Sequence, residues 1–275
     1  MLFRSTYADF LAFGALLVVP AAALAQFGGV LAPPSSPPPS SAVGNAVDAI
    51  VAANKKRANT YLDSASVLVL GQQRTIYQYI GDMNALIAPG AATRSDVLMG
   101  KFNLVDAVNY EKRKLTNPGL SGIRQSVIDS AFQEVYGRPS TPLEQAQYDP
   151  QLRSGRMWFA PMVLAEQARL NGNKQVRAAL IQQVFQRAEG RPGSPVEIGF
   201  WLQRSEDYAA MMLAARAWLY SPVGANDLIA TVARAQATQN RPTDPASIKA
   251  AMAQYEPDRK IYNEMVGITG KLFKK

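Results

Sequence analysis

The chain has 275 residues, and its 29 Lys and Arg outnumber its 21 Asp and Glu, which gives a net charge of +8. It contains neither histidine nor cysteine. This composition excludes disulfide bonds, thiol nucleophiles, Cys/His zinc sites and histidine acid–base catalysis. We therefore expect no metal site and no cofactor.

Residues 1–25 carry the pattern of a cleavable signal peptide. Arg4 gives a short positive region, residues 10–19 are apolar apart from glycine, and Pro20 breaks the helix. The small-residue sequence Ala23-Leu24-Ala25 predicts cleavage between Ala25 and Gln26. The apolar run is shorter than a comfortable membrane span, although an uncleaved anchor is the alternative. We expect a periplasmic or secreted protein with no transmembrane segment after cleavage.

Residues 26–41 form a Pro/Ser-rich linker, which we expect to be extended. Residues 42–118 are expected to form an N-terminal helical hairpin or the start of a bundle. We predict helices over 45–58, 61–87 and 95–115, with Gly71 and Gly81 inside the second without ending it. Pro89-Gly90 and Asn117-Pro118-Gly119 are predicted to end the second and third helices. One apolar face is predicted for the second helix, made of Leu62, Ala65, Val69, Ile76, Ile80, Met83 and Ile87.

An internal repeat lies in the second half of the chain. Residues 131–144 and 184–197 align without a gap at an offset of 53 residues. The identical pairs are Phe132/Phe185, Gln133/Gln186, Gly137/Gly190, Arg138/Arg191, Pro139/Pro192, Pro142/Pro195 and Glu144/Glu197. A fainter third copy contains Arg241 and Pro245. The repeat predicts an all-α domain over 119–275, built from two to three related helix–elbow–helix units.

Each repeated residue has an expected structural role. The phenylalanines should face the core, and the glycines should end a helix in the left-handed conformation. Thr141 or Ser194 should cap the next helix, with proline at its first position and glutamate at its third, as a capping box. Asp244-Pro245 should do the same without the glutamate.

The repeated arginines allow two interpretations. Arg138 and Arg191 could grip an anion outside the chain. They could instead donate to carbonyls at the preceding helix end, or pair with a carboxylate of the same unit, which we favour.

In the segment 131–153, residues 132–144 read F-Q-E-V-Y-G-R-P-S-T-P-x-E, and the aromatic Tyr148 and the run Leu152-Arg153-Ser154-Gly155 follow. This segment resembles repeated helical modules of unknown function in secreted and surface-layer-associated bacterial proteins. It is also similar to the phycobilisome linker domain. The sequence departs from the pattern at Pro139 and Pro192, where an acidic residue is expected. The resemblance implies scaffolding or surface attachment and supplies no catalytic residues.

Paired carboxylates are the one catalytic route that the residues leave open. The candidates are Glu134, Glu144, Glu166, Glu197 and Glu206-Asp207. We interpret Glu144 and Glu197 as capping residues and the others as solvated helix positions. Two segments rich in large apolar residues, 157–164 and 211–220, are interpreted as core.

We expect an exported, non-enzymatic helical scaffold or binding protein of the bacterial envelope, with no catalytic residue. Its expected partner is another envelope protein or an anionic glycan, and no specific nucleic acid. One alternative is a glycan-active protein, which requires two carboxylates facing each other across an open groove. Another is a polyanion-binding protein that uses Lys55-Lys56-Arg57, Lys112-Arg113-Lys114 and the tail lysines Lys271, Lys274 and Lys275.

Overall fold

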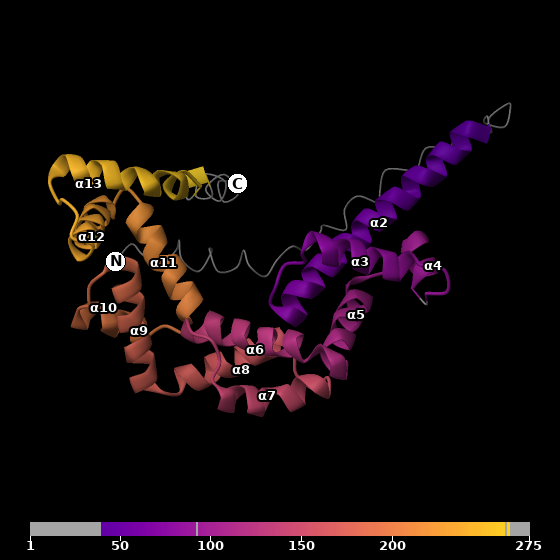
Figure 1. Ribbon diagram of the computed structural model, residues 1–275, viewed down its shortest axis with the longest axis horizontal. Coiled ribbons are helices and arrows are strands. Elements are labelled where there is room, and N and C mark those ends of the chain that lie inside the picture. Colours follow the sequence, from indigo (N-terminus) through magenta and orange to yellow (C-terminus); the bar gives the residue numbers. More distant parts are fainter. Residues whose placement is uncertain (1–39, 92, 262, 265–275) are drawn as a thin grey trace. The chain divides into compact units, whose positions relative to one another are not determined.

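The described part of the chain is built entirely from helices. The computed structural model describes residues 40–91, 93–261, 263 and 264, with side chains from residue 44 onward. These residues form twelve α-helices and two short 3-10 turns without a strand, which confirms the all-α prediction (Figure 1). The predicted signal peptide, most of the linker and the C-terminal lysines lie outside the described residues. The described residues up to 49 and those from 50 onward belong to two units, and the predicted boundary at 118/119 stays a prediction.

Gly71 ends the first helix, so the prediction of one helix over 61–87 is wrong. Helix α2 spans Ser40–Leu70 and α3 spans Ile76–Ile87. Gly71 adopts a φ of +69°, and a Cβ there would collide with the ring of Phe159. Thr75 and Gln78 then form the capping box that starts α3. The break changes the helical phase, which leaves Ile76 and Ile80 exposed while Leu62, Ala65, Val69 and Met83 are buried.

The predicted helix over 95–115 is also two helices. Helix α4 covers Arg94–Leu98 and α5 covers Leu104–Thr116. Gly100 takes a φ of +71° between them, and Asn103 and Asp106 form a capping box that begins α5. The predicted stops at Pro89-Gly90 and Asn117-Pro118-Gly119 are confirmed, since α3 ends at Ile87 and α5 at Thr116.

The remaining helices follow with short connections. After the 3-10 turn Pro118–Leu120 come α6 (Ser121–Tyr136), α7 (Pro142–Arg153), α8 (Phe159–Asn171), α9 (Lys174–Glu189), α10 (Pro195–Leu202), α11 (Tyr208–Tyr220), α12 (Ala225–Thr238), α13 (Pro245–Met252) and the turn Ala253–Tyr255. None of the helices in the described residues has the length and apolarity that a bilayer span requires.

Four apolar clusters follow one another along the chain, and helices shared between them join neighbouring clusters. The first joins α2, α3, α4 and α5, and the second joins the end of α2 with α5, α6, α7 and α8. The third joins the end of α6 with α8, α9 and α11, and the fourth joins α11 with α12 and α13. Phe132 and Phe185 are buried in the second and third clusters, which confirms their predicted core role.

The two apolar segments predicted as core are only partly so. Met162, Met211 and Leu219 are buried, but Leu164 and Leu213 are exposed. The side chain of Trp218 is about one-third exposed, and its indole Nε1 donates to Asp227.

Candidate functional site

The two elbows have the same backbone geometry. Gly137 ends α6 with a φ of +67°, and Gly190 ends α9 with a φ of +64°. Thr141 caps α7 and Ser194 caps α10, each within a complete capping box that has proline at the first helical position. The predicted glycine stops and proline-led caps are therefore confirmed.

Each repeated arginine pairs with the glutamate of its own elbow. Arg138 makes two hydrogen bonds to the carboxylate of Glu144, at 2.9 and 2.8 Å, and donates to the carbonyl of Pro139. Arg191 binds Glu197 in the same bidentate way, at 2.9 and 2.6 Å. The guanidinium also lies over the ring of the repeated phenylalanine in both units, 5.4 Å from the Phe132 centroid in the first and 5.2 Å from the Phe185 centroid in the second. The pairing within the unit, which we favour from the sequence, is present in both elbows.

This pairing lowers the pKa of both capping glutamates. The pKa of Glu144 falls to about 2, chiefly because Arg138 hydrogen-bonds its charged form, and that of Glu197 falls to about 2 through Arg191. A lowered folded-state pKa contributes stability above the ordinary pKa near 4.5, and that stability is lost as the pH falls toward 2.

Two substitutions at Glu144 distinguish the contribution of the ion pair to stability from that of the capping box. Gln at this position keeps the capping box and removes the charge, so Glu144→Gln should lower the free energy of unfolding by about 0.5 kcal/mol. Glu144→Ala removes both and should cost about 1–2 kcal/mol at pH 7. Urea unfolding at pH 7 and pH 3 measures this. The cost of Glu144→Gln should shrink at pH 3, and an equal cost at both pH values would rule out a contribution from the charge.

The third elbow keeps the backbone geometry without the ion pair. Asn240 stands where the other copies have glycine, and it is the one non-glycine residue with a positive φ (53°) among the described residues. Asp244 caps α13 as predicted, accepting from the amides of Ala246 and Ser247. Ser247 occupies the position of the glutamate, so Arg241 has no carboxylate partner within its own elbow.

An arginine from the next unit contacts each glycine stop. Arg187 of α9 donates to the carbonyl of Gly137 at 3.0 Å, and Arg234 of α12 donates to the carbonyl of Glu189 at 2.8 Å. These carbonyls lie at helix ends, where the backbone acceptors lack partners within the helix. The contacts tie successive units together, and the predicted motif did not include these two arginines.

Each elbow also exposes one apolar side chain. Leu143 and Val196 occupy the second position of α7 and α10, between the proline and the capping glutamate. Their side chains are 80% and 82% exposed. The equivalent residue of the third copy, Ala246, is exposed as well.

Several candidate carboxylates are buried, so their interpretation as solvated helix positions is wrong. Glu166 is 1% exposed, the hydroxyls of Tyr136 and Tyr148 donate to its carboxylate, and Arg169 pairs with it at 3.0 Å. Burial and the adjacent carboxylate raise the pKa of Tyr148 to about 12. Sequence reasoning missed this group because the two tyrosines come from other helices.

Glu206 and Asp207 are buried at the start of α11. Glu206 pairs with Arg204 at 2.5 Å. Asp207 caps α11 through the amide of Ala210 and accepts from the side chain of Gln167. Solvent reaches Glu134 on α6, but neighbouring groups desolvate its carboxylate in part, and this desolvation and the nearby Asp207 raise its pKa.

An open cleft of about 720 Å³ runs along α6, and we call it the α6 cleft. Its lining on α6 follows one helical stripe from Gly122 to Glu134, and its other walls are Gly71, Pro139, Tyr208 and Ala209. Its two carboxylates, Asp129 and Glu134, lie on the same helix. The glycan-active alternative requires carboxylates on opposite sides of a groove, whereas both carboxylates in this lining come from α6.

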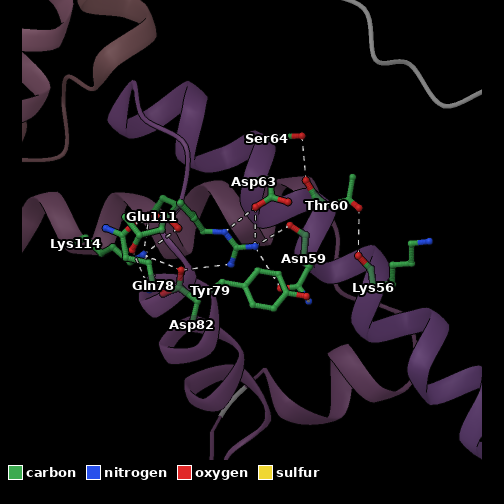
Figure 2. Close-up of polar contacts among 12 residues, drawn as sticks. Lys56, Asn59, Thr60, Asp63, Ser64, Gln78, Tyr79, Asp82, Glu111 and Lys114 are labelled. Atoms are coloured by element: carbon green, nitrogen blue, oxygen red, sulfur yellow. Dashed lines mark hydrogen bonds and ion pairs between the residues drawn. The ribbon is translucent and has the colours of Figure 1, made fainter.

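A buried ionic network joins α2, α3 and α5, and nothing in the sequence pattern indicated it (Figure 2). Arg74, whose side chain is 2% exposed, contacts Asp63, Asp82 and the carbonyl of Asn59. Lys114 lies 3.0 Å from Asp82 and from Glu111. Glu111 is fully buried, and burial raises its pKa despite Lys114.

Two of the three cations of the basic cluster at 112–114 are engaged within the fold, and Arg113 is exposed. Lys112 lies over the ring of Trp158, 3.3 Å from its centroid, and Lys114 belongs to the ionic network. Lys56 and Arg57 are exposed on α2. In the described residues, fewer cations are therefore available to bind a polyanion than the sequence indicated.

Comparison with known proteins identified no relative. No family model, curated protein or solved structure matches the chain. The resemblance of residues 131–153 to envelope-associated helical modules stays a prediction.

Proposed function

We propose that the chain is an exported, non-enzymatic helical binding protein of the bacterial envelope, which holds a protein partner on its elbows. The observation that carries the proposal is the paired exposure of Leu143 and Val196, 80% and 82%, at equivalent positions of two units. A single exposed apolar side chain is ordinary on a protein surface. The same exposure in two copies of one motif indicates a surface that a partner covers.

The elbows hold these side chains in fixed positions. A left-handed glycine, a proline, a capping box and a bidentate Arg–Glu pair restrain each one. A surface ordered before binding loses less conformational entropy when its partner arrives. Because the arginines are satisfied inside the chain, the apolar side chains rather than the charges are the contact groups.

The contacts that the candidate carboxylates make within the chain support a non-enzymatic role. Glu144, Glu197 and Asp207 cap helices, Glu166 is held by two tyrosines, and Glu206 pairs with Arg204. Export is supported by the signal-peptide pattern of residues 1–25, and a scaffold role by the resemblance of residues 131–153.

The test is co-purification from envelope extracts after gentle cross-linking. The wild-type chain, starting at Gln26 if export is as proposed, should recover a stable partner. Serine is compatible with the second helical position, so the double variant Leu143→Ser, Val196→Ser should stay folded and lose most of that partner. The matched control is Val223→Ser, at a loop residue that is 70% exposed. Two results contradict the proposal. The first is recovery of the wild-type chain as a free monomer, and the second is that Val223→Ser loses as much of the partner as the double variant does.

A further inference from the structure

The α6 cleft carries an unused set of polar groups. Gln125, Ser130, Gln133 and Glu134 line it, and within the described residues their side chains make no hydrogen bond or ion pair. They lie within ten consecutive residues of one helix, and the nine steps between the first and the last correspond to about 14 Å along its axis. Gln125, Gln133 and Glu134 are exposed and Ser130 is half-buried, so all four are accessible to a ligand.

The two polar groups between them are fixed by the chain. Asp129 accepts from the amide of Ser140 at 3.0 Å and from its hydroxyl at 2.5 Å. Ser126 accepts a hydrogen bond from the side chain of Gln72. These contacts connect α6 to the elbow and to the segment after α2, so the floor of the cleft is held in place before any ligand arrives.

The lining of the cleft disfavours a negatively charged ligand. It contains two carboxylates and no Lys or Arg, although the chain as a whole carries +8. A sulfated, phosphorylated or carboxylated ligand would meet negative charge without a compensating cation. An anionic glycan, the partner class expected from the composition, therefore does not fit this cleft.

The lining also determines the functional groups of the ligand. Glutamine amides and serine hydroxyls both donate and accept, as sugar hydroxyls do, and carboxylates accept from them. Gly122 and Ala209 are small, and nothing lies within 4 Å of where a Cβ of Gly122 would stand, which leaves room beside α6 for rings. An extended peptide would need an unpaired strand edge or apolar side-chain pockets, and the described residues contain no strand.

We propose that the α6 cleft is a binding site for a neutral oligosaccharide, recognised by Gln125, Ser130, Gln133 and Glu134. Its volume of about 720 Å³ lies within the usual range of small-ligand sites. The site is separate from Leu143 and Val196. Oligosaccharide binding goes beyond the proposed binding of a partner protein at the elbows, and an experiment can refute one of these two proposals without refuting the other.

Calorimetric titration of the whole mature chain tests the site. The neutral probes are tetrasaccharides of glucose with β-1,4 links, of glucose with α-1,4 links and of N-acetylglucosamine. A sulfated tetrasaccharide and a hexapeptide of Ala, Gly and Ser are the comparison probes. At least one neutral probe should bind, and the sulfated probe and the peptide should not compete with it.

Matched variants locate the binding on α6. The double variant Ser130→Ala, Gln133→Ala should weaken binding about tenfold, since each lost hydrogen bond contributes about 0.5–1.5 kcal/mol. Gln147→Ala, at an exposed glutamine of α7 outside the cleft, should leave binding unchanged. The proposal is overturned if no neutral probe binds at 10 mM, if the double variant binds as the wild type does, or if only the sulfated or peptide probe binds. The 10 mM ceiling corresponds to about −3 kcal/mol, below which binding is too weak to matter.

Discussion

Lys114→Met is expected to lower the free energy of unfolding by about 3–5 kcal/mol at pH 7, because it leaves buried carboxylates without their cation. Lys114 contacts Asp82 and Glu111 at 3.0 Å, and Glu111 has no other cation within ion-pair distance in the described residues. Asp82 keeps Arg74 and Tyr110 as partners. The loss therefore falls mainly on Glu111, which is fully buried.

A second substitution and a pH series test the cause. Adding Glu111→Met should recover most of the lost stability, since a buried pair replaced by apolar groups of similar size is often neutral. The pKa of Glu111 is already raised by burial, and removing Lys114 should raise it further. A raised folded-state pKa favours the folded state at low pH, so the cost of Lys114→Met should shrink as the pH falls toward 4.5. A cost that is independent of pH, with no recovery in the double variant, would show that packing and not charge is lost.

Gly137→Ala should destabilise the chain far more than Gly190→Ala, although both glycines end a helix with nearly the same φ. The left-handed conformation costs alanine about 1–2 kcal/mol at either position. At Gly190 the nearest atom to an added Cβ is 3.8 Å away, on Arg234. At Gly137 three ring atoms of Tyr208 would lie at 2.6 Å, and overpacking of this kind adds about 1–3 kcal/mol.

Tyr208 cannot easily move away from Gly137. Its ring is 8% exposed in the third apolar cluster, and its hydroxyl contacts Arg187 at 2.9 Å. Urea unfolding of the two alanine variants measures the difference, which should be at least about 1 kcal/mol. Equal costs for the two variants would mean that the ring yields to the added methyl group.

The elbows could be predicted from sequence because their determinants act locally. Thr141, Pro142 and Glu144 form a cap within four residues, and a glycine stop needs only its own left-handed conformation. The pairing of Arg138 with Glu144 joins residues six positions apart. Features of this kind depend little on the rest of the fold.

The break at Gly71 shows where sequence reasoning was insufficient. The helical spacing continues past this residue, and the contact that requires a glycine there is with the ring of Phe159, far along the chain. Thr75 and Gln78 did carry the capping-box signal for a new helix. A local signal was therefore present but was outweighed by the apolar periodicity.

The buried polar groups and the cleft could not be predicted at all. Glu166 is buried because Tyr136 and Tyr148 reach it from two other helices. The α6 cleft needs the end of α2 and the start of α11 beside the polar face of α6. Residue spacing within one helix does not determine which helices pack against it.

Site-specific photo-crosslinking at the elbows tests partner binding most directly. A photoreactive amino acid would replace Leu143, Val196 or, as a control, Leu164 on α8, which is 66% exposed. In living cells, the probes at 143 and 196 should yield an adduct with the same partner protein, and the probe at 164 should yield none. No adduct at either elbow, or the same adduct at all three positions, would contradict binding of a partner at the repeated elbows.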